Sequence, residues 1–445
     1  MSQNNNAIKL IEAYKLKEAI YNSKTHTFLQ QYRQDAIAHL RLLGLPTEKD
    51  ENYKRCNINQ LFNEPIDSAP SDKEQSNTDN NILEELGITP QNKESISLYF
   101  VNNHFNRDLS TDLNRLPKEV YIGSISDFLQ LHPSRESEIA QIYGRLAEPD
   151  IDGTVALNQL FVQDLLFINI EKGTHLDLPI VLHHIVAGDG SVLTSPRLML
   201  NIDEGASAQI ILLNHHHRAG TIVNRVNEIV VGKGARLEFA SLQRESEDSS
   251  IISNTILRLH KDSQTICDEF VFSKGVSRNN IRARFIGENA KLILNGMAIG
   301  RGQSLIDNFT RVEHTRPECE TDELYNYLVD DQAITSFAGR IFISQGAQKT
   351  LAYQQNRNIL LSQKAKAFSK PQLEIYADDV KCSHGMTTGQ LDEDALFYMR
   401  QRGIPLDIAR DMLSSAFAEK VIDRVEIPFF QETLREEVRK ALTKA

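Results

Sequence analysis

Tryptophan is absent from the 445-residue chain, and cysteine occurs only four times, as Cys56, Cys267, Cys319 and Cys382. The cysteines lie far apart and form no Cys-x-x-Cys pair. This spacing excludes a self-contained zinc ribbon and favours reduced thiols over a disulfide framework. The first residues carry neither a basic stretch nor an apolar stretch, so no secretory signal is expected. Together these features predict a cytoplasmic protein.

Long apolar runs and an excess of basic residues are missing as well. No stretch approaches the roughly 18 apolar residues that suggest a membrane span. Lysine and arginine number 49 against 60 aspartates and glutamates, which gives a formal net charge of -11. Because neutralising phosphate needs clustered basic residues, this balance argues against a general nucleic-acid or anionic-membrane binder, although it leaves room for local basic patches.

The motifs of common self-sufficient catalytic sites are also absent. The chain has no Gly-x-x-x-x-Gly-Lys-[Ser/Thr] loop for ATP, no Gly-x-Ser-x-Gly nucleophile turn and no His-Glu-x-x-His zinc helix. Its acidic residues are too scattered to nominate a pair for glycoside hydrolysis. We therefore expect a protein that is not an enzyme.

A repeated pattern does fill the chain from about residue 96 to residue 380: an apolar stretch, a turn carrying Gly or Ala, and a further apolar stretch. Ala206, Ala235, Ser263 and Ala290 mark successive turns at spacings of 29, 28 and 27 residues. A period of this size indicates stacked supersecondary units. Units made of strands alone predict a β-helix or a related β-solenoid. An antiparallel sandwich or barrel, which also has short strands between turns, is the alternative.

Helical patterns lie on both sides of this core. We expect an N-terminal helical region at 1–95 with a polar linker at about 63–81, a β core at 96–385 with a helical insertion near 125–148, and a C-terminal helical region at 386–445.

The C-terminal region is amphipathic. Asp392 is placed to cap a first helix, Gly403 to end it and Pro405 to start the next, where apolar residues recur at i, i+3 and i+4. Such helices either cover the exposed end of the stack or offer their apolar stripe to a partner. The residues alone leave both uses open.

Cys382 and His384 are the candidate metal ligands. An extended strand would place this thiol and this imidazole on the same side. Two such donors could fill two positions of an iron or zinc ion and leave the others to another molecule. The alternative is a buried cysteine beside a hydrogen-bonded histidine, because no second ligand pair is visible nearby.

The run His215, His216 and His217 is a weaker candidate. In a strand His215 and His217 face one side and His216 the other, so at most two of them could share a metal. A structural role for partly exposed histidines is favoured, and the role of the run stays open. The neighbours His183 and His184 would point to opposite faces.

Around Cys382, the stretches Lys370–Gly385, Thr388–Glu393 and Leu396–Ile404 follow one another in order, and together they resemble the signature of the SufB/SufD family of iron–sulfur cluster assembly proteins. Within that family, Gly385 after His384 is similar to the SufD branch rather than the SufB branch. A tryptophan expected near Tyr53 is absent. The matching segments form one ordered block over about residues 335–425. They are Phe337–Phe342, Gly346–Thr350, Ala352–Leu361, Lys370–Gly385, Thr388–Glu393 and Leu396–Ile404.

This resemblance implies a right-handed parallel β-helix flanked by helical regions. It also implies a non-catalytic scaffold in a complex with a SufB subunit and two copies of the ATPase SufC. His384 would contribute one imidazole to a nascent iron–sulfur cluster shared with SufB, Cys382 being a second candidate, and no cofactor would be held by this chain alone. The last strands would pair edge to edge with SufB, or with a second copy when the chain is isolated. The C-terminal helices would dock SufC, through Leu396, Tyr398, Met399, Ile408, Met412, Phe417 and Val421.

Two other functions compete with this one. A SufB-like scaffold would hold a reconstituted cluster without a partner. A β-helix enzyme acting on polysaccharide would need a groove of acidic and basic side chains and usually a secretory signal, neither of which is apparent.

Overall fold

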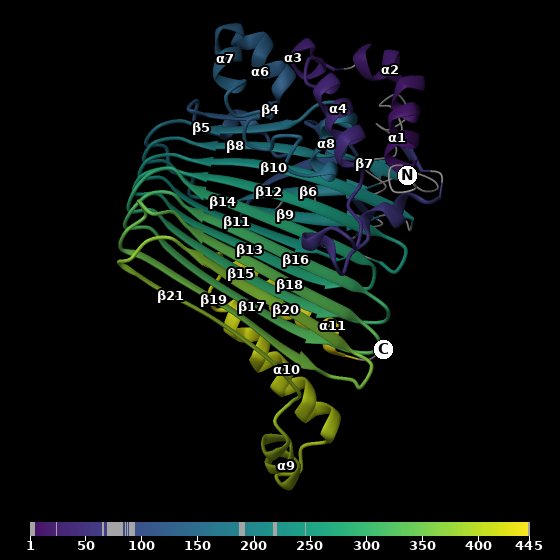
Figure 1. Ribbon diagram of the computed structural model, residues 1–445, viewed down its shortest axis with the longest axis vertical. Coiled ribbons are helices and arrows are strands. Elements are labelled where there is room, and N and C mark those ends of the chain that lie inside the picture. Colours follow the sequence, from purple (N-terminus) through teal and green to yellow (C-terminus); the bar gives the residue numbers. More distant parts are fainter. Residues whose placement is uncertain are drawn as a thin grey trace.

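Figure 1 shows the computed structural model of the chain. It describes residues 5–443 except for 24, 65, 69–82, 85, 87, 89–93, 187–191, 217–219 and 245. Most of the polar linker expected at about 63–81 lies outside the described residues.

The core is a parallel β-solenoid in which consecutive strands, from residue 197 onward, alternate between two sheets (Figure 1). This confirms the expected fold class and excludes the antiparallel sandwich. Sheet A contains, in sequence order, β1 (Asp67–Ser68), β4 (Val120–Ser124), β5 (Leu166–Ile170), β7 (Val192–Thr194), β8 (Arg197–Ile202), β10 (Thr221–Val231), β12 (Ser250–Leu259), β14 (Val276–Phe285), β16 (Leu305–His314), β18 (Ile334–Ile343) and β20 (Lys366–Ile375). Sheet B contains β2 (Ile96–Val101), β3 (His104–Asn106), β6 (Ile180–Val186), β9 (Ser207–His216), β11 (Arg236–Gln243), β13 (Gln264–Ser273), β15 (Lys291–Gly300), β17 (Glu320–Val329), β19 (Thr350–Leu360) and β21 (Val380–Gly389).

The period in the sequence comes from small residues at the turn before each strand of sheet B. The carbonyls of Ala206, Ala235, Ser263 and Ala290 each accept a hydrogen bond from the first strand residue of the next turn of the solenoid. Each of the four is at most 1% exposed. Cys319 occupies the next place in this column and is equally buried. The tight turn therefore selects side chains no larger than a thiol.

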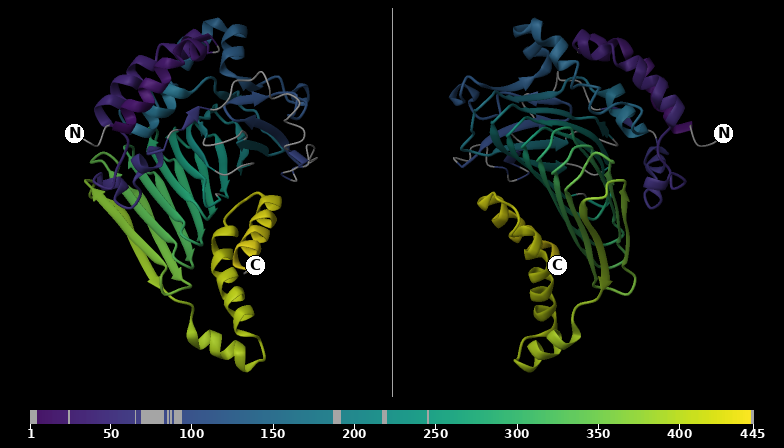
Figure 2. Two further views of the ribbon diagram at one scale, coloured as in Figure 1. Left: turned by 90° about the vertical axis from the view of Figure 1, so that its right-hand side faces the viewer. Right: turned by 60° about the vertical axis from the view of Figure 1, so that its left-hand side comes forward.

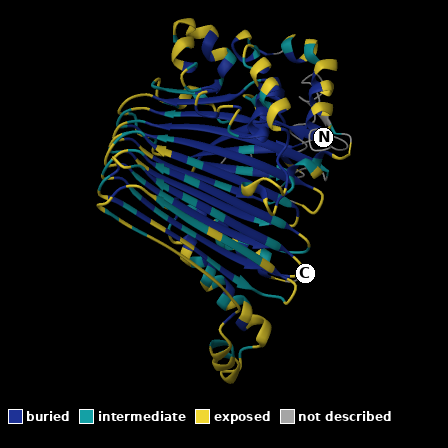
Figure 3. Ribbon diagram, in the orientation of Figure 1, coloured by how far each residue is buried: buried dark blue, intermediate teal, exposed yellow. Residues whose placement is uncertain are grey.

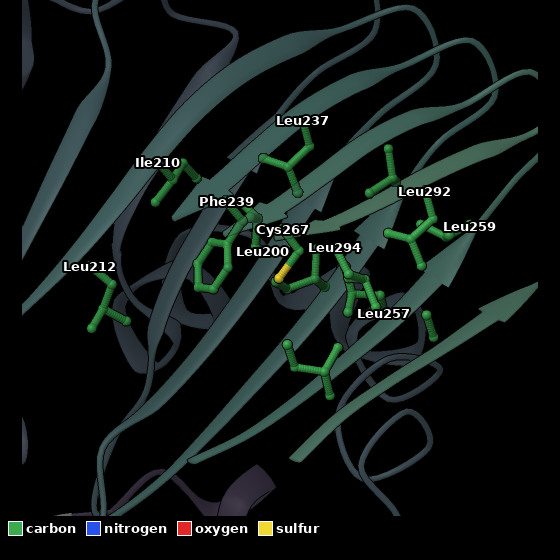
Figure 4. Packing of buried hydrophobic residues seen from close by; sticks show 14 of the residues in the cluster. Leu200, Ile210, Leu212, Leu237, Phe239, Leu257, Leu259, Cys267, Leu292 and Leu294 are labelled. Carbon is green, nitrogen blue, oxygen red and sulfur yellow. The ribbon is translucent and has the colours of Figure 1, made fainter. Parts of the chain in front are cut away.

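Inside the solenoid the strands are packed by aliphatic and aromatic side chains, because the inward-facing residues of both sheets alternate with outward-facing ones. Phe239, Cys267 and Leu294 are register neighbours on three successive strands. The sulfur of Cys267 lies among the surrounding leucines in Figure 4. Cys267 is therefore a core residue of the solenoid.

Helices cover the outer face of sheet A and the first turns of the solenoid (Figures 1 and 2). The insertion expected near 125–148 contains two short helices, and a third, α8, follows it. All nine residues of α8 are buried, and Asp152 caps it by accepting a hydrogen bond from the Thr154 backbone. The elements of this region are α1 (Asn5–Leu16), α2 (Glu18–Ser23), α3 (Thr27–Gln30), α4 (Arg33–Leu43), η2 (Glu51–Tyr53), η3 (Ile58–Phe62), η5 (Leu113–Arg115), α6 (Ile125–Leu131), η6 (Pro133–Arg135), α7 (Glu136–Ile139) and α8 (Gly153–Phe161).

The C-terminal region folds into α9 (Glu393–Gln401), α10 (Leu406–Ile422) and α11 (Pro428–Leu442). Asp392 caps α9 and Gly403 has a positive φ after its end, as the sequence predicts. Helices α10 and α11 contact β17, β15 and β13 on the outer face of sheet B. Helix α9 projects beyond the last strands, and its ribbon is mostly exposed in Figure 3.

The two ends of the solenoid differ. At the N-terminal end, β3 and β4 run antiparallel to their neighbours. At the C-terminal end, β20 and β21 are the last strands of their sheets, and each pairs on one side only within the described chain. Strand β21 runs on through Gly389, past the boundary expected at residue 385. In the part of the chain that the structure describes, no helix combines the length and apolar character needed to span a bilayer.

Candidate functional site

The open end of the solenoid carries both candidate ligands on β21. Cys382 pairs with Ala352 and His384 with Gln354 of the neighbouring strand β19. Because residues two apart in a strand face the same side, the thiol and the imidazole both belong to the side that faces the interior of the solenoid. The structure therefore brings together the pair that the sequence singled out.

The two side chains differ in accessibility. Cys382 is half-buried and packs against the core of the solenoid, and this burial raises the pKa of its thiol. A raised pKa keeps the thiol protonated, and the protonated form is a poor metal ligand. His384 is exposed at the end of its column. An imidazole binds iron through the lone pair of a ring nitrogen. Because His384 is exposed, it is the better placed ligand of the two.

A group of buried, hydrogen-bonded polar side chains lies beside the strand of His384 and ends at Gln354, the register partner of His384. Thr310 and Gln354 both donate hydrogen bonds to Oε2 of Glu323, each at 2.9 Å. Gln354 fills space left by Gly339, since a Cβ at that glycine would lie 2.2 Å from Nε2 of Gln354. Burial raises the pKa of Glu323 to about 7.

This polar group was not predicted from the sequence, although the position of Glu323 in the repeat is a signal for it. Glu323 is the register partner of Leu294, and the positions before it in the same inward-facing column are apolar. A carboxyl group at an apolar position of the repeat marks a buried polar site. Among the described residues, no three His, Cys, Asp or Glu side chains lie together in an arrangement that could hold a metal ion.

Large apolar side chains are exposed on the last turns of the solenoid. Tyr376 follows β20 and is 62% exposed, and Met386 on β21 is 54% exposed. Ile375 and Tyr353 are also exposed. Exposed apolar residues beside unpaired strand edges are typical of a protein-binding surface.

The C-terminal helices separate the predicted partner-binding residues into two groups. Tyr398, Ile408 and Met412 are exposed, and Leu396 and Met399 are partly exposed. Val421 is fully buried and packs with Phe417 against the outer face of sheet B. Val421 therefore belongs to the core of this chain and not to its exposed helical surface, because α10 turns this side toward the sheet.

Within the described part of the histidine run, the side chain of His215 contacts one histidine and one arginine. His215 lies 3.1 Å from His183, between Nε2 and Nδ1, and Arg244 lies 3.4 Å from the other ring nitrogen of His215. Burial and the charge of Arg244 lower the pKa of His183 to about 4. His217 and the side chain of His216 lie outside the described residues. His184 faces the interior and contacts Arg225 and the carbonyl of Asn102.

The remaining cysteines are buried. Burial raises the pKa of Cys56 to about 12 and also raises the pKa values of Cys267 and Cys319. Their surroundings are the N-terminal helical cluster, the solenoid core and a tight turn.

The sequence matches two family models. Residues 184–417 match the SufBD core domain of the SUF system for Fe–S cluster assembly, and residues 4–182 match the SufBD protein N-terminal region.

Similar proteins carry related names. The chain is 30% identical to the iron–sulfur cluster assembly protein SufD of Escherichia coli over 398 residues, which cover 88% of each chain. It is 28% identical to an iron–sulfur cluster assembly SufBD family protein of Synechocystis sp. over 440 residues, covering 96% of this chain and 94% of the relative. It is also 28% identical to the chloroplastic protein ABCI7 of Arabidopsis thaliana over 407 residues, covering 89% and 82%. The chain therefore belongs to the SufBD family of Fe–S cluster assembly proteins.

Proposed function

We propose that this chain is a SufD-type scaffold subunit that works in the cytoplasm without catalysing a reaction itself. It pairs through the open end of its solenoid with a SufB-type subunit. Iron and sulfide are the cargo of this assembly, and His384 supplies one ligand to the cluster as it forms. A SufC-type ATPase docks on the exposed side of α9 and α10.

The observation that carries the proposal is the open end itself. Strands β20 and β21 each have an unpaired edge in the described structure, and His384 lies on the last of them. An unpaired edge is a template for a strand from another chain, which would complete the sheet and cover Tyr376 and Met386. The same pairing would bring donor groups of the partner next to His384.

The proposal assigns different tasks to His384 and its neighbours. The imidazole is accessible and binds iron, while Cys382 holds the strand against the core. A metal-binding histidine usually donates a hydrogen bond from the N–H of its second ring nitrogen to an oxygen acceptor. Gln354 is the register partner of His384, and its Oε1 has no hydrogen-bond partner among the described residues. This oxygen is a candidate to fix the orientation of the imidazole.

Edge pairing can be tested by co-expressing the chain with SufB-type and SufC-type subunits. Met386→Lys introduces a charge at the open end, and we expect it to lower the recovery of the SufB-type subunit about tenfold or more, because a charged edge disfavours strand pairing. The same substitution should reduce self-association of the isolated chain, measured by light scattering.

Leu131→Lys is the matched control. Leu131 is 70% exposed on α6, at the opposite end of the molecule. Equal recovery of the SufB-type subunit with Met386→Lys and with Leu131→Lys would contradict pairing through the open end. So would a chain that holds a reconstituted cluster without any partner, since that result identifies a SufB-like scaffold.

A further inference from the structure

A cleft of about 640 Å³ lies on the outer face of sheet A, far in sequence from the open end. Its walls are the segment 145–151, which connects α7 to α8, and the strands β12, β14 and β16. A volume of this size is typical of small-molecule sites.

The cleft is basic although the chain as a whole carries a formal charge of -11. Five arginines line it, against two glutamates, Glu148 and Glu313. The arginines are Arg145, Arg258, Arg282, Arg284 and Arg311. His260 also lines the cleft, and burial together with Arg258 lowers the pKa of this histidine. The cleft therefore holds an excess of positive charge at neutral pH.

The strand register places these arginines side by side. Arg282 pairs with Arg311, and Arg258 with Arg284, as direct neighbours on the same outer face. Like charges directly opposite one another destabilise a sheet. Glu313 offsets part of this repulsion, since it lies 2.7 Å from Arg311 and 3.7 Å from Arg284.

Three of the arginines lack such a partner. The side chains of Arg145, Arg258 and Arg282 form no hydrogen bond or ion pair with the described part of the chain. Arg282 is partly exposed, its Cζ lies 5.2 Å from the centroid of the Phe309 ring, and its buried Nε has no hydrogen-bond partner among the described residues. The charge of Asp152 favours the charged form of Arg282, but the unpartnered Nε leaves a hydrogen-bond donor unsatisfied, and an anion in the cleft would satisfy it.

The remaining wall of the cleft is apolar. Leu146, Ile151, Ile256 and Ile286 lie beside the arginines. Guanidinium groups bind phosphate oxygens through pairs of parallel hydrogen bonds, and an apolar wall binds a flat or hydrocarbon group. The matching ligand is one molecule that carries both parts.

We propose that this cleft binds a small organic phosphate, with a di- or polyphosphate group on Arg258 and Arg282 and a ring system on the apolar wall. An acidic segment of another protein is the competing occupant. The size of the cleft and its apolar wall favour the small molecule. The proposal is independent of the pairing proposed for the open end.

The test uses the full isolated chain and isothermal titration calorimetry with inorganic pyrophosphate, ADP, adenosine and a polyglutamate peptide. We expect pyrophosphate and ADP to bind, with ADP the tighter of the two, and adenosine and the peptide to bind far more weakly. Arg282→Gln and Arg258→Gln should each weaken ADP binding about 10-fold to 100-fold, the loss expected for a charge-assisted hydrogen bond.

Arg357→Gln is the matched control, because it removes the same charge from the outer face of sheet B. It should change the affinity for ADP less than twofold. Arg258 is partly exposed, so its variant keeps the test usable if Arg282→Gln destabilises the fold. Absence of binding by both phosphates, tighter binding of the peptide, or an equal loss in the Arg357→Gln variant would overturn the proposal.

Discussion

Glu269 and Glu323 are carboxyl groups in the interior of a solenoid whose other inward-facing positions are mostly apolar or neutral. Burial raises the pKa of Glu269 to about 8 and that of Glu323 to about 7. In Glu323 the hydrogen bonds from Thr310 and Gln354 partly oppose this effect. In Glu269 the opposing influence is the charge of Arg278, and Oε2 has no hydrogen-bond partner among the described residues.

The raised pKa of Glu269 predicts a pH-dependent loss of stability. Its stabilising contribution is complete below the pKa of about 4.5 in the unfolded chain and is lost as the pH rises through about 8. Glu269→Gln should therefore leave the free energy of unfolding nearly unchanged near pH 4.5. Above pH 8 it should raise that energy on the order of 5 kcal/mol, since the two pKa values differ by about 3.5 and one pKa unit corresponds to about 1.4 kcal/mol. Urea unfolding at several pH values measures the difference.

Glu247→Gln provides the comparison for this prediction, because Glu247 is exposed. Its effect on stability should be small in the same unfolding measurements. A Glu269→Gln variant whose stability follows the wild type at every pH would show that Glu269 is not held in its protonated form.

At the scale of elements, α10 and α11 cover part of the solenoid, but they lie on the outer face of sheet B and not at the end of the stack, which was the place expected from the sequence. One side of this helix pair covers the outer face of sheet B, where Ala418, Phe430 and Leu434 pack with Phe270 and other residues of the strands. Ile408 and Met412, on the first half of α10, stay exposed. The i, i+3, i+4 pattern could not separate the buried residues from the exposed ones. The side of the helix that meets the sheet depends on where α10 crosses sheet B, and the pattern does not contain this information.

Paired substitutions can separate the two sides of the helices. Ile408→Asp and Met412→Asp should leave the stability within about 0.5 kcal/mol of wild type, as is usual for exposed positions. They should nevertheless reduce the amount of SufC-type ATPase that co-purifies with the chain. Phe430→Ala should instead destabilise the chain by about 3 to 5 kcal/mol, because it empties a packed core position. Thermal unfolding and affinity co-purification together read out both effects.

An ATPase that co-purifies in normal amounts with both aspartate variants would contradict docking on this side of α10. Deleting residues 404–445 is a poorer test, because the deletion uncovers the apolar outer face of sheet B and can cause aggregation by itself. The same face explains why Val421, which the sequence predicted to bind a partner, packs inside this chain instead.

At the scale of the whole molecule, the solenoid could be predicted because every turn of the solenoid requires a small residue at the same place. The small residues Ala206, Ala235, Ser263 and Ala290 recur wherever the chain must turn tightly. Cys382 and His384 could be placed on one side of a strand for a similar reason, since the alternation in a strand is local.

Features made by distant segments could not be predicted in this way. Glu323 meets Thr310 and Gln354 across different strands, and the basic cleft joins Arg282 to the segment 145–151. Helix α8 was missed because its side chains are buried all round, so it shows no amphipathic pattern. Its capping residue Asp152 was the one local signal available.

The central claim is that the open end of this chain supplies one ligand to a cluster completed by a partner. The most direct test is anaerobic reconstitution of the co-purified complex, measuring bound iron and sulfide for the wild type, His384→Ala and His175→Ala. His175 is an exposed histidine near the first turns of the solenoid and serves as the control.

We expect His384→Ala to leave the subunits assembled but to lower cluster loading about tenfold or more, since loss of a ligand costs at least as much as loss of a group that orients one. His175→Ala should load like the wild type. Normal loading of the intact His384→Ala complex would contradict the account.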